Sequence, residues 1–352
     1  MIQKIPVDQF LLLSKDHPVL DVRSPAEFKH AHIPGAYSLP LFSDEERKII
    51  GTTYKQESRE KAIKTGLDYF GVKMRKMVEE VEGLLKGYDR NIYVHCWRGG
   101  MRSAAVAWLL DLYGYRVTSL TGGYKAFRNL VLQQFLLSYE IRVLGGYTGS
   151  GKTILLHELA TLGHPVIDLE GLANHKGSAF GALGEQSQPS QEMFENLLGV
   201  QLFNFCRGRE NRNGNALERF WLEDESQRIG LLNIPKQFFD QMRNSKLYFF
   251  DIPFEKRLEY LVDTYGQFEK EKLVNAIMRI QKRLGGLETK MAISALLENE
   301  VSSCFSILLK YYDKLYSKGL HNRINFENKL NIIPCENVNT GVNIHKLFLQ
   351  EV

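Results

Sequence analysis

Short apolar runs alternate with helical stretches in the first part of the chain. Apolar runs at 18–22, 91–96 and 116–120 predict strands, and amphipathic stretches at 73–85 and 103–114 predict helices. A polar loop is predicted between the first strand and the first of these helices. Strands that alternate with helices favour a mostly parallel sheet with helices on its faces.

A second alternation follows an uninterrupted helical run at 124–139. Its strand candidates lie at the start of 140–153 and within 164–170, 219–224 and 246–253, and the pattern is helical from 255 to about 318. No sequence repeat relates the two parts. We therefore predict an α/β chain of two unlike domains. The predicted parts are a parallel-sheet domain at 1–130, a connecting helix at 131–139 and an α/β domain at 140–352 with a helical extension at about 255–318.

Composition agrees with an enzyme-sized globular chain. Of its 352 residues, 44% are hydrophobic and 24% are charged, which argues against disorder. No stretch approaches the roughly 18 apolar residues that span a bilayer, so we expect no membrane partner and a cytoplasmic location. The cysteines are too widely spaced for a zinc site or a disulfide framework, and they are Cys96, Cys206, Cys304 and Cys335. We therefore expect any functional cysteine to act alone.

Charge differs mildly between the two parts. Residues 1–135 contain 20 Lys and Arg against 15 Asp and Glu, whereas the remainder is almost balanced. This bias permits a polyanionic partner such as RNA without requiring one.

The second apolar run ends at Cys96 and leads into Cys-Trp-Arg-Gly-Gly-Met-Arg-Ser, directly before a predicted helix. Gly99 and Gly100 allow the backbone to curl so that N–H groups face inward, and the helix N-terminus adds positive potential. Arg98 and Arg102 strengthen this field. A cysteine placed there is expected to ionise readily and to hold an anion or its own persulfide or perselenide. We therefore predict that the cysteine and both arginines are catalytic.

Residues upstream of this loop add a family resemblance. The segments Asp-Val-Arg-Ser-Pro-Ala-Glu-Phe at 21–28 and His-Ile-Pro-Gly-Ala at 32–36 are similar to the rhodanese signature. Together with the cysteine loop they cover about residues 1–130. The resemblance implies that Asp21 and Arg23 support the active loop from beneath and that the cysteine carries sulfur or selenium.

The spacing within the cysteine loop leaves two reactions open. Five residues separate Cys96 from Arg102, which is the spacing of Cys-based phosphatases of similar fold, whereas many sulfurtransferases have one fewer. A wider loop could accept phosphate or selenophosphate. The loop alone therefore does not separate a phosphatase from a chalcogen transferase.

A second motif, Gly-Tyr-Thr-Gly-Ser-Gly-Lys-Thr at 146–153, matches the phosphate-binding P-loop and lies between a predicted strand and a predicted helix. We expect its backbone amides to hold a diphosphate, Lys152 to neutralise it and Thr153 to be able to ligate Mg²⁺. The predicted phosphate-binding residues are Gly146, Thr148, Gly149, Ser150, Gly151, Lys152 and Thr153.

Acidic residues at later strand ends are candidates for a metal or water ligand beside the P-loop. They are Asp168, Glu170, Glu223, Asp224, Glu225 and Asp251. The sequence does not choose between them, and each could instead cap a strand or pair with an arginine. The segment 171–181 also carries His175 and Lys176, which could reach a phosphate or form an ordinary surface turn.

The order of the two motifs extends the resemblance to the whole chain. A rhodanese-like domain followed by a P-loop domain, with GGYKAFR at 122–128, VIDLEGLANHKGSAFG at 166–181 and WLEDESQRIG at 221–230, resembles tRNA 2-selenouridine synthases. The resemblance implies a bacterial enzyme that acts on the wobble uridine of tRNAs for Lys, Glu and Gln. In that family 2-thiouridine is S-geranylated with geranyl diphosphate, and selenium from selenophosphate then replaces the geranylthio group. A selenophosphate-supplying enzyme would be a further partner.

An RNA substrate requires cations for its phosphates and aromatic rings for an unpaired base. Candidate contacts to tRNA or substrate are Trp97, Tyr147, His175, Lys176, Arg279, Lys282 and Arg283. Two other functions stay open at this point. One is a P-loop kinase or NTPase with a regulatory rhodanese-like domain, and the other is the Cys-based phosphatase.

Overall fold

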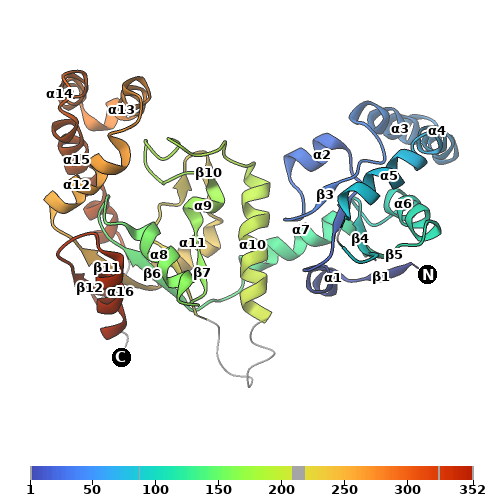
Figure 1. Ribbon diagram of the computed structural model, residues 1–352, viewed down its shortest axis with the longest axis horizontal. Coiled ribbons are helices and arrows are strands. Elements are labelled where there is room, and N and C mark those ends of the chain that lie inside the picture. Colours follow the sequence, from blue (N-terminus) through green and yellow to red (C-terminus); the bar gives the residue numbers. More distant parts are fainter. Residues whose placement is uncertain (1, 87, 208–218, 324–325, 351–352) are drawn as a thin grey trace. The chain divides into compact units, whose positions relative to one another are not determined.

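The computed structural model in Figure 1 describes residues 2–86, 88–207, 219–323 and 326–350. The chain forms two compact units, each built on a parallel sheet with helices, so the predicted α/β fold class is confirmed. The first unit comprises Met1–Gln134 and Glu195–Val200, and the second comprises Phe135–Phe194 and Gln201–Val352. The return of six residues to the first unit is a feature that the linear order of motifs does not indicate.

A five-stranded parallel sheet in the order β1-β5-β4-β2-β3 forms the first unit. Its elements are β1 Gln3–Ile5, α1 Val7–Leu13, β2 Val19–Asp21, α2 Pro25–His30, β3 Tyr37–Ser38, α3 Asp44–Gln56, α4 Arg59–Gly71, α5 Met74–Leu84, β4 Asn91–His95, α6 Met101–Leu112, β5 Arg116–Leu120 and α7 Gly123–Gln134. The central position of β4 places the residue after it, Cys96, at the carboxyl edge of the sheet, where α/β proteins bind ligands.

Helices α2, α3 and α4 occupy most of the segment for which the hydrophobic pattern predicts a polar loop, so that prediction is wrong. Charged side chains dilute the apolar periodicity of these helices. The start of α3 nevertheless carries a capping box. The N–H of Glu46 donates to Ser43 Oγ at 3.2 Å, and the N–H of Ser43 donates to Glu46 Oε2 at 2.8 Å. This local start signal could have identified the helix.

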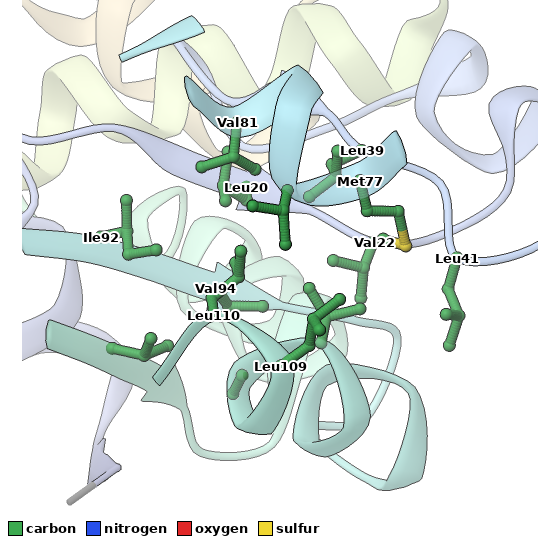
Figure 2. Packing of buried hydrophobic residues seen from close by; sticks show 14 of the residues in the cluster. Leu20, Val22, Leu39, Leu41, Met77, Val81, Ile92, Val94, Leu109 and Leu110 are labelled. Atoms are coloured by element: carbon green, nitrogen blue, oxygen red, sulfur yellow. The ribbon is translucent and has the colours of Figure 1, made fainter. Parts of the chain in front are cut away.

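Apolar side chains from strands and helices fill the core of the first unit (Figure 2). Leu20 and Val94 from the sheet meet Val81 of α5 and Leu110 of α6, and all four are fully buried. Each such side chain contributes roughly 1.5–3 kcal/mol to folding by leaving water. Cys96 belongs to the same cluster, so the cysteine loop is attached directly to the core.

Helix α7 ends earlier than the predicted run at 124–139. The Gln241 side chain donates from Nε2 to the carbonyl of Leu137 at 2.8 Å and accepts from the N–H of Tyr139 at 3.1 Å. These tertiary hydrogen bonds take backbone groups that a longer helix would use. The chain therefore leaves the helix after Gln134, and residues 135–140 connect it to β6.

The second unit has a five-stranded parallel sheet in the order β12-β11-β6-β8-β7, with a separate antiparallel pair formed by β9 and β10. Its elements are β6 Ile141–Gly145, α8 Lys152–Thr161, β7 Val166–Ile167, α9 Leu169–Ala173, α10 Gln191–Arg207, β8 Phe220–Glu223, β9 Arg228–Ile229, β10 Leu232–Asn233, α11 Lys236–Asn244, β11 Lys246–Asp251, α12 Phe254–Tyr265, α13 Lys270–Leu284, α14 Gly286–Leu297, α15 Val301–His321, the 3₁₀ helix η1 Phe326–Asn328, β12 Leu330–Pro334 and α16 Thr340–Leu349.

The predicted helical extension is present as α12 to α15 (Figure 1). These helices share an apolar core of their own, which includes Leu261, Ile277 and Leu309, and Phe180 from the loop after α9 packs into it. A second cluster, which includes Leu144, Leu156 and Phe250, lies against the sheet. None of the described helices is long and apolar enough to cross a membrane.

Candidate functional site

The cysteine loop starts where β4 ends. Cys96 is only 3% exposed, and its Sγ lies 3.3 Å from the hydroxyl of Ser103 in the first turn of α6. Gly99 adopts a φ of +65°, a conformation that a side chain would strain, and Gly100 caps the helix. The loop therefore curls around the sulfur of Cys96 and places it at the N-terminus of α6, as the sequence predicts.

The Gly122–Gly123 turn before α7 holds this loop in place. A Cβ on Gly123 would lie 2.3 Å from the carbonyl oxygen of Cys96 and 2.5 Å from the nitrogen of Gly99. The N–H of Tyr124 donates to the Cys96 carbonyl at 2.8 Å, and the N–H of Lys125 donates to the Trp97 carbonyl at 3.0 Å. The segment GGYKAFR is therefore a structural part of the cysteine loop, a role that its sequence alone does not reveal.

Hydrogen bonds and charge activate the thiol of Cys96. Burial alone would raise its pKa, but the hydroxyl and N–H of Ser103, the N–H of Arg98 and the positive charge of Arg102 outweigh burial and lower the pKa. In contrast, burial raises the pKa of Cys304 and of Cys335 to about 11. Of these three thiols, Cys96 is therefore the one suited to act as a thiolate.

We expect alkylation of Cys96 by iodoacetamide to reach its half-maximal rate below the pH of an ordinary thiol, about 8.5. A lowered pKa means that the thiolate persists as the pH falls, so reactivity disappears only below that lowered value. Quantifying the Cys96 peptide by mass spectrometry measures this. Ser103→Ala should shift the midpoint upward, and a wild-type midpoint at or above the ordinary value would contradict the activation.

A buried ion pair supports the loop from beneath. Arg23 and Asp21 are 1% and 0% exposed, and Arg23 Nη2 lies 2.6 Å from Asp21 Oδ2. The Arg23 guanidinium also lies 3.8 Å from the ring centroid of Tyr124, whose hydroxyl accepts a hydrogen bond from Asn196 Nδ2 at 2.7 Å. The ring of Trp97 packs 5.6 Å from that of Tyr124 and stays 38% exposed. The contact with Tyr124 holds one side of the Trp97 ring, and the rest of the ring remains accessible.

Replacing Arg23 with methionine should destabilise the first unit by about 3–5 kcal/mol, because the carboxylate of Asp21 would remain buried without its partner. Urea unfolding followed by tryptophan fluorescence measures the loss, since Trp97 and Trp108 both belong to this unit. The double variant Asp21→Asn, Arg23→Met should recover part of the stability. A change below about 1 kcal/mol in the single variant would show that the pair is not a structural support.

The two arginines of the loop differ in their surroundings. Arg98 is exposed and forms no ion pair with any residue that the structure describes. Arg102 is partly buried, and its Nη1 lies 2.7 Å from Glu27 Oε2. An arginine committed to a carboxylate is not free to bind a phosphate dianion. A phosphate dianion would have to displace Glu27 to bind Arg102, which counts against the phosphatase interpretation.

The P-loop adopts the predicted geometry between β6 and α8. Gly149 and Gly151 have φ values of +82° and +71°, which glycine tolerates and other residues rarely adopt. Lys152 Nζ donates to the carbonyl of Gly146 at 2.9 Å, and Thr153 Oγ1 donates to Glu170 Oε2 at 2.9 Å. The loop thus places a lysine and a hydroxyl at the start of a helix, the arrangement that binds phosphate groups.

Three glutamates lie next to the P-loop. Glu223 ends β8 with both carboxylate oxygens buried and without a hydrogen-bond partner. Burial raises the pKa of Glu223 well above its ordinary value, and the neighbouring Glu170 and Asp168 raise it further. Burial likewise raises the pKa of Glu225, followed by the charges of Glu170 and Glu223. A cation that bound among these carboxylates would favour their deprotonated forms and so displace protons from them.

A cavity of about 680 Å³ opens directly from the P-loop. Its polar end includes Lys152, Thr153 and Glu170, and its other wall is apolar and aromatic. That wall consists of Phe180, Leu261, Tyr265, Ile280, Phe305, Leu308, Leu309, Tyr312 and Leu315, which come from α12, α13, α15 and the loop after α9. The helical extension therefore gives the phosphate site an adjoining apolar pocket.

The chain is similar to known proteins over most of its length. A family model described as the tRNA 2-selenouridine synthase AAA domain matches residues 139–331, and a rhodanese-like domain model matches residues 7–130. A tRNA 2-selenouridine synthase of Nitrosomonas europaea is 34% identical over 90% of this chain and 92% of its own length. Those of a Sulfurovum species and of Hydrogenovibrio crunogenus are 35% and 36% identical over 85% and 78% of this chain, and 87% and 78% of their own lengths.

The chain belongs to the tRNA 2-selenouridine synthase family. The predicted family resemblance is thereby confirmed. The two family models cover both motif-bearing parts of this synthase-family chain, so the rhodanese-like prediction for the first part is confirmed, and the second part matches the AAA domain of the synthases.

Other acidic candidates in this synthase-family chain have structural partners. Asp224 forms ion pairs with Arg323 and Arg243 and accepts a hydrogen bond from the hydroxyl of Tyr316 at 2.6 Å. Asp168 caps α9 and lies 2.7 Å from His157 Nε2. Asp251 is exposed at the end of β11 and does not line the cavity. Glu170 and Glu225 line the cavity beside the P-loop, and the buried Glu223 interacts electrostatically with both.

The predicted tRNA-contact residues fall into different surroundings. Lys176 and Arg283 line the cavity, whereas Arg279 and Lys282 lie on the exposed face of α13. His175 is 9% exposed, and its ring packs against the glycines at 181 and 230. Tyr147 is fixed beside the P-loop, where its hydroxyl lies 3.2 Å from Ser317 Oγ and its ring packs edge-on against Phe249 and Tyr316. Lys176 and Arg283 are therefore the basic candidates nearest the phosphate site.

Sequence reasoning missed two residues that organise the P-loop. Arg257 of α12 is buried, donates to the carbonyl of Thr148 at 3.1 Å and forms an ion pair with Asp313. The N–H of Gly146 donates to the hydroxyl of Tyr316 at 3.2 Å, and the Tyr316 ring lies 5.8 Å from Lys152 Nζ. Both belong to helices whose amphipathic pattern carries no sign of a site. Only tertiary structure brings them to the loop.

Proposed function

We propose that this chain converts 2-thiouridine at the tRNA wobble position to 2-selenouridine in two steps. The relatives reported above carry the name of that synthase activity. The observation that carries the first step is that one cavity joins a diphosphate-binding loop to an apolar and aromatic wall. Geranyl diphosphate has the same two parts, an anionic head and a hydrocarbon chain.

In the first step the sulfur of 2-thiouridine attacks C1 of geranyl diphosphate. The C1–O bond breaks, diphosphate leaves and the nucleobase loses its N3 proton, which yields S-geranyl-2-thiouridine. The P-loop amides and Lys152 stabilise the negative charge that develops on the leaving diphosphate. The aromatic wall holds the hydrocarbon chain away from water. No nucleotide hydrolysis is required.

The residues beside the P-loop fit a diphosphate-bound Mg²⁺. Thr153 Oγ1 and the partnerless, fully buried carboxylate of Glu223 would hold it, with Glu170 next to them. When bound, the cation would neutralise charge on the diphosphate. The described residues include no group of three His, Cys, Asp or Glu placed to hold a metal alone. This fits Mg²⁺, which takes most of its ligands from substrate phosphates and water.

In the second step selenium from selenophosphate replaces the geranylthio group at C2 of the base. A C–Se bond forms and the C–S bond breaks, so that geranylthiol leaves. Water then cleaves the Se–P bond and releases phosphate, and no oxidant or reductant is consumed. We assign this step to the cysteine loop, where the loop amides, with Arg98, hold the anionic donor. The Cys96 thiolate would add to C2 of the base as the geranylthio group leaves, and selenium would then displace the thiolate from C2, which regenerates it.

The proposed substrates are cytoplasmic tRNAs for Lys, Glu and Gln that carry 2-thiouridine, and the selenophosphate comes from a separate supplying enzyme. The test incubates the chain with such a tRNA, geranyl diphosphate and selenophosphate, followed by digestion to nucleosides and mass spectrometry. Geranylated and selenated nucleosides should both form, and the geranyl step should fail in EDTA. Absence of both products, or rapid ATP or GTP turnover without any response to geranyl diphosphate, would favour the kinase alternative.

A further inference from the structure

The Glu27–Arg102 ion pair lies at the edge of the cysteine loop. Arg102 belongs to the first turn of α6, and its guanidinium acts electrostatically on the Cys96 sulfur. Glu27 is held firmly on the other side, because its Oε2 also accepts a hydrogen bond from the N–H of Ser24 at 3.0 Å. The side chains of Arg102 and Glu27 are only 17% and 26% exposed, so solvent screens the pair weakly.

The ion pair changes the charge that the loop offers to a ligand. The inward-facing amides and the helix N-terminus attract any anion. Of the two loop arginines, Arg98 is without an ion-pair partner among the described residues, whereas the guanidinium of Arg102 is paired with Glu27. A tetrahedral dianion can gain a bidentate contact with Arg102 only by displacing a carboxylate that already occupies it.

We propose that Glu27 determines the anion specificity of the cysteine loop. Its ion pair keeps the Arg102 guanidinium from binding ligands, so the loop binds phosphate-type dianions weakly. The phosphate released in the proposed selenium step then leaves readily, and ambient phosphate does not block Cys96. The same competition lowers the affinity of the loop for the selenium donor. Glu27 therefore weakens donor binding and at the same time speeds release of the phosphate product. The proposed function is needed only to explain why phosphate is present. The binding claim itself is independent of it.

The test measures how inorganic phosphate protects Cys96 from iodoacetamide in the full-length chain, with the Cys96 peptide followed by mass spectrometry. In Glu27→Gln the amide oxygen can still accept from the Ser24 N–H, but the charge that holds Arg102 is gone. We expect half-protection at a phosphate concentration at least about tenfold lower than in the wild type. Half-protection is compared with the rate of the same variant without phosphate, because freeing Arg102 also changes the reactivity of Cys96. An unchanged thermal unfolding temperature would show that the loop is intact.

A double variant isolates the cause. Glu27→Gln, Arg102→Gln should return to weak protection, because the gain in the single variant comes from the freed arginine. Should Glu27→Gln fold poorly, Glu27→Asp serves instead, since its shorter side chain separates the carboxylate from Arg102. Unchanged protection in the folded single variant, or equally strong protection in the double variant, would overturn the proposal. Failure of tRNA selenation would leave these binding results untouched, so the two hypotheses fail separately.

Discussion

The Cys96→Ser variant is expected to geranylate 2-thiouridine tRNA at the wild-type rate while its selenation rate falls at least about 100-fold. The serine hydroxyl does not ionise near neutral pH, so the loop would lose the thiolate that Ser103 and Arg102 stabilise. The P-loop cavity is lined entirely by residues of the second unit, so we expect the geranyl step proposed there not to depend on the sulfur of Cys96. Nucleoside mass spectrometry over a time course measures both rates in one reaction.

A matched control is Cys335→Ser, which makes the same atomic change at a buried thiol of the second unit. Cys335 donates to the carbonyl of Ile333 and does not line the cavity, so both reactions should continue in this variant. An S-geranylated anticodon stem-loop supplied directly should remain unselenated by Cys96→Ser. Equal loss of geranylation and selenation in Cys96→Ser would contradict the assignment of one step to each loop.

Local sequence was sufficient to locate both loops. Gly99 after Cys96 allows a curled backbone, and Gly149 and Gly151 allow the P-loop conformation, because few other residues tolerate their positive φ values. Strand and helix periodicity placed each motif between the right elements. Each loop is specified by residues that lie within about ten positions of one another in sequence. Contacts between distant segments are therefore not needed to recognise it.

The remaining parts of the sites depend on contacts between distant segments. The apolar wall of the cavity comes from helices more than 100 residues after the P-loop, and its members look like ordinary core positions of amphipathic helices. Glu27 lies 75 residues from its partner Arg102 in sequence, and Arg323 lies 99 residues from its partner Asp224. A single sequence gives no signal for such pairs. It therefore predicted Asp224 and Glu223 as equals, whereas the fold pairs one with arginines and leaves the other without a partner.

The Lys152→Ala variant should lose at least about 100-fold in the geranylation rate. Lys152 is the only lysine in the P-loop, and its ammonium lies between the Gly146 carbonyl and the ring of Tyr316, at the polar end of the cavity. Removing one preorganised contact to a developing anion costs roughly 10²–10³ in rate. The apolar wall remains, so binding of the hydrocarbon chain should weaken less than the rate of the chemical step. Single-turnover rates at saturating geranyl diphosphate measure the effect.

The control for Lys152→Ala is Lys256→Ala on α12, whose ammonium forms only an exposed ion pair with Glu259. That variant should geranylate normally, because the residue lies outside the cavity lining. Lys152→Ala should also still selenate a stem-loop that is already S-geranylated, since we assign this step to the cysteine loop. Lys152→Arg keeps the positive charge but not the compact shape of the ammonium. Its geranylation rate should therefore lie between those of Lys152→Ala and Lys256→Ala. A wild-type geranylation rate in Lys152→Ala would remove the P-loop from the chemistry and leave the apolar cavity without its proposed substrate.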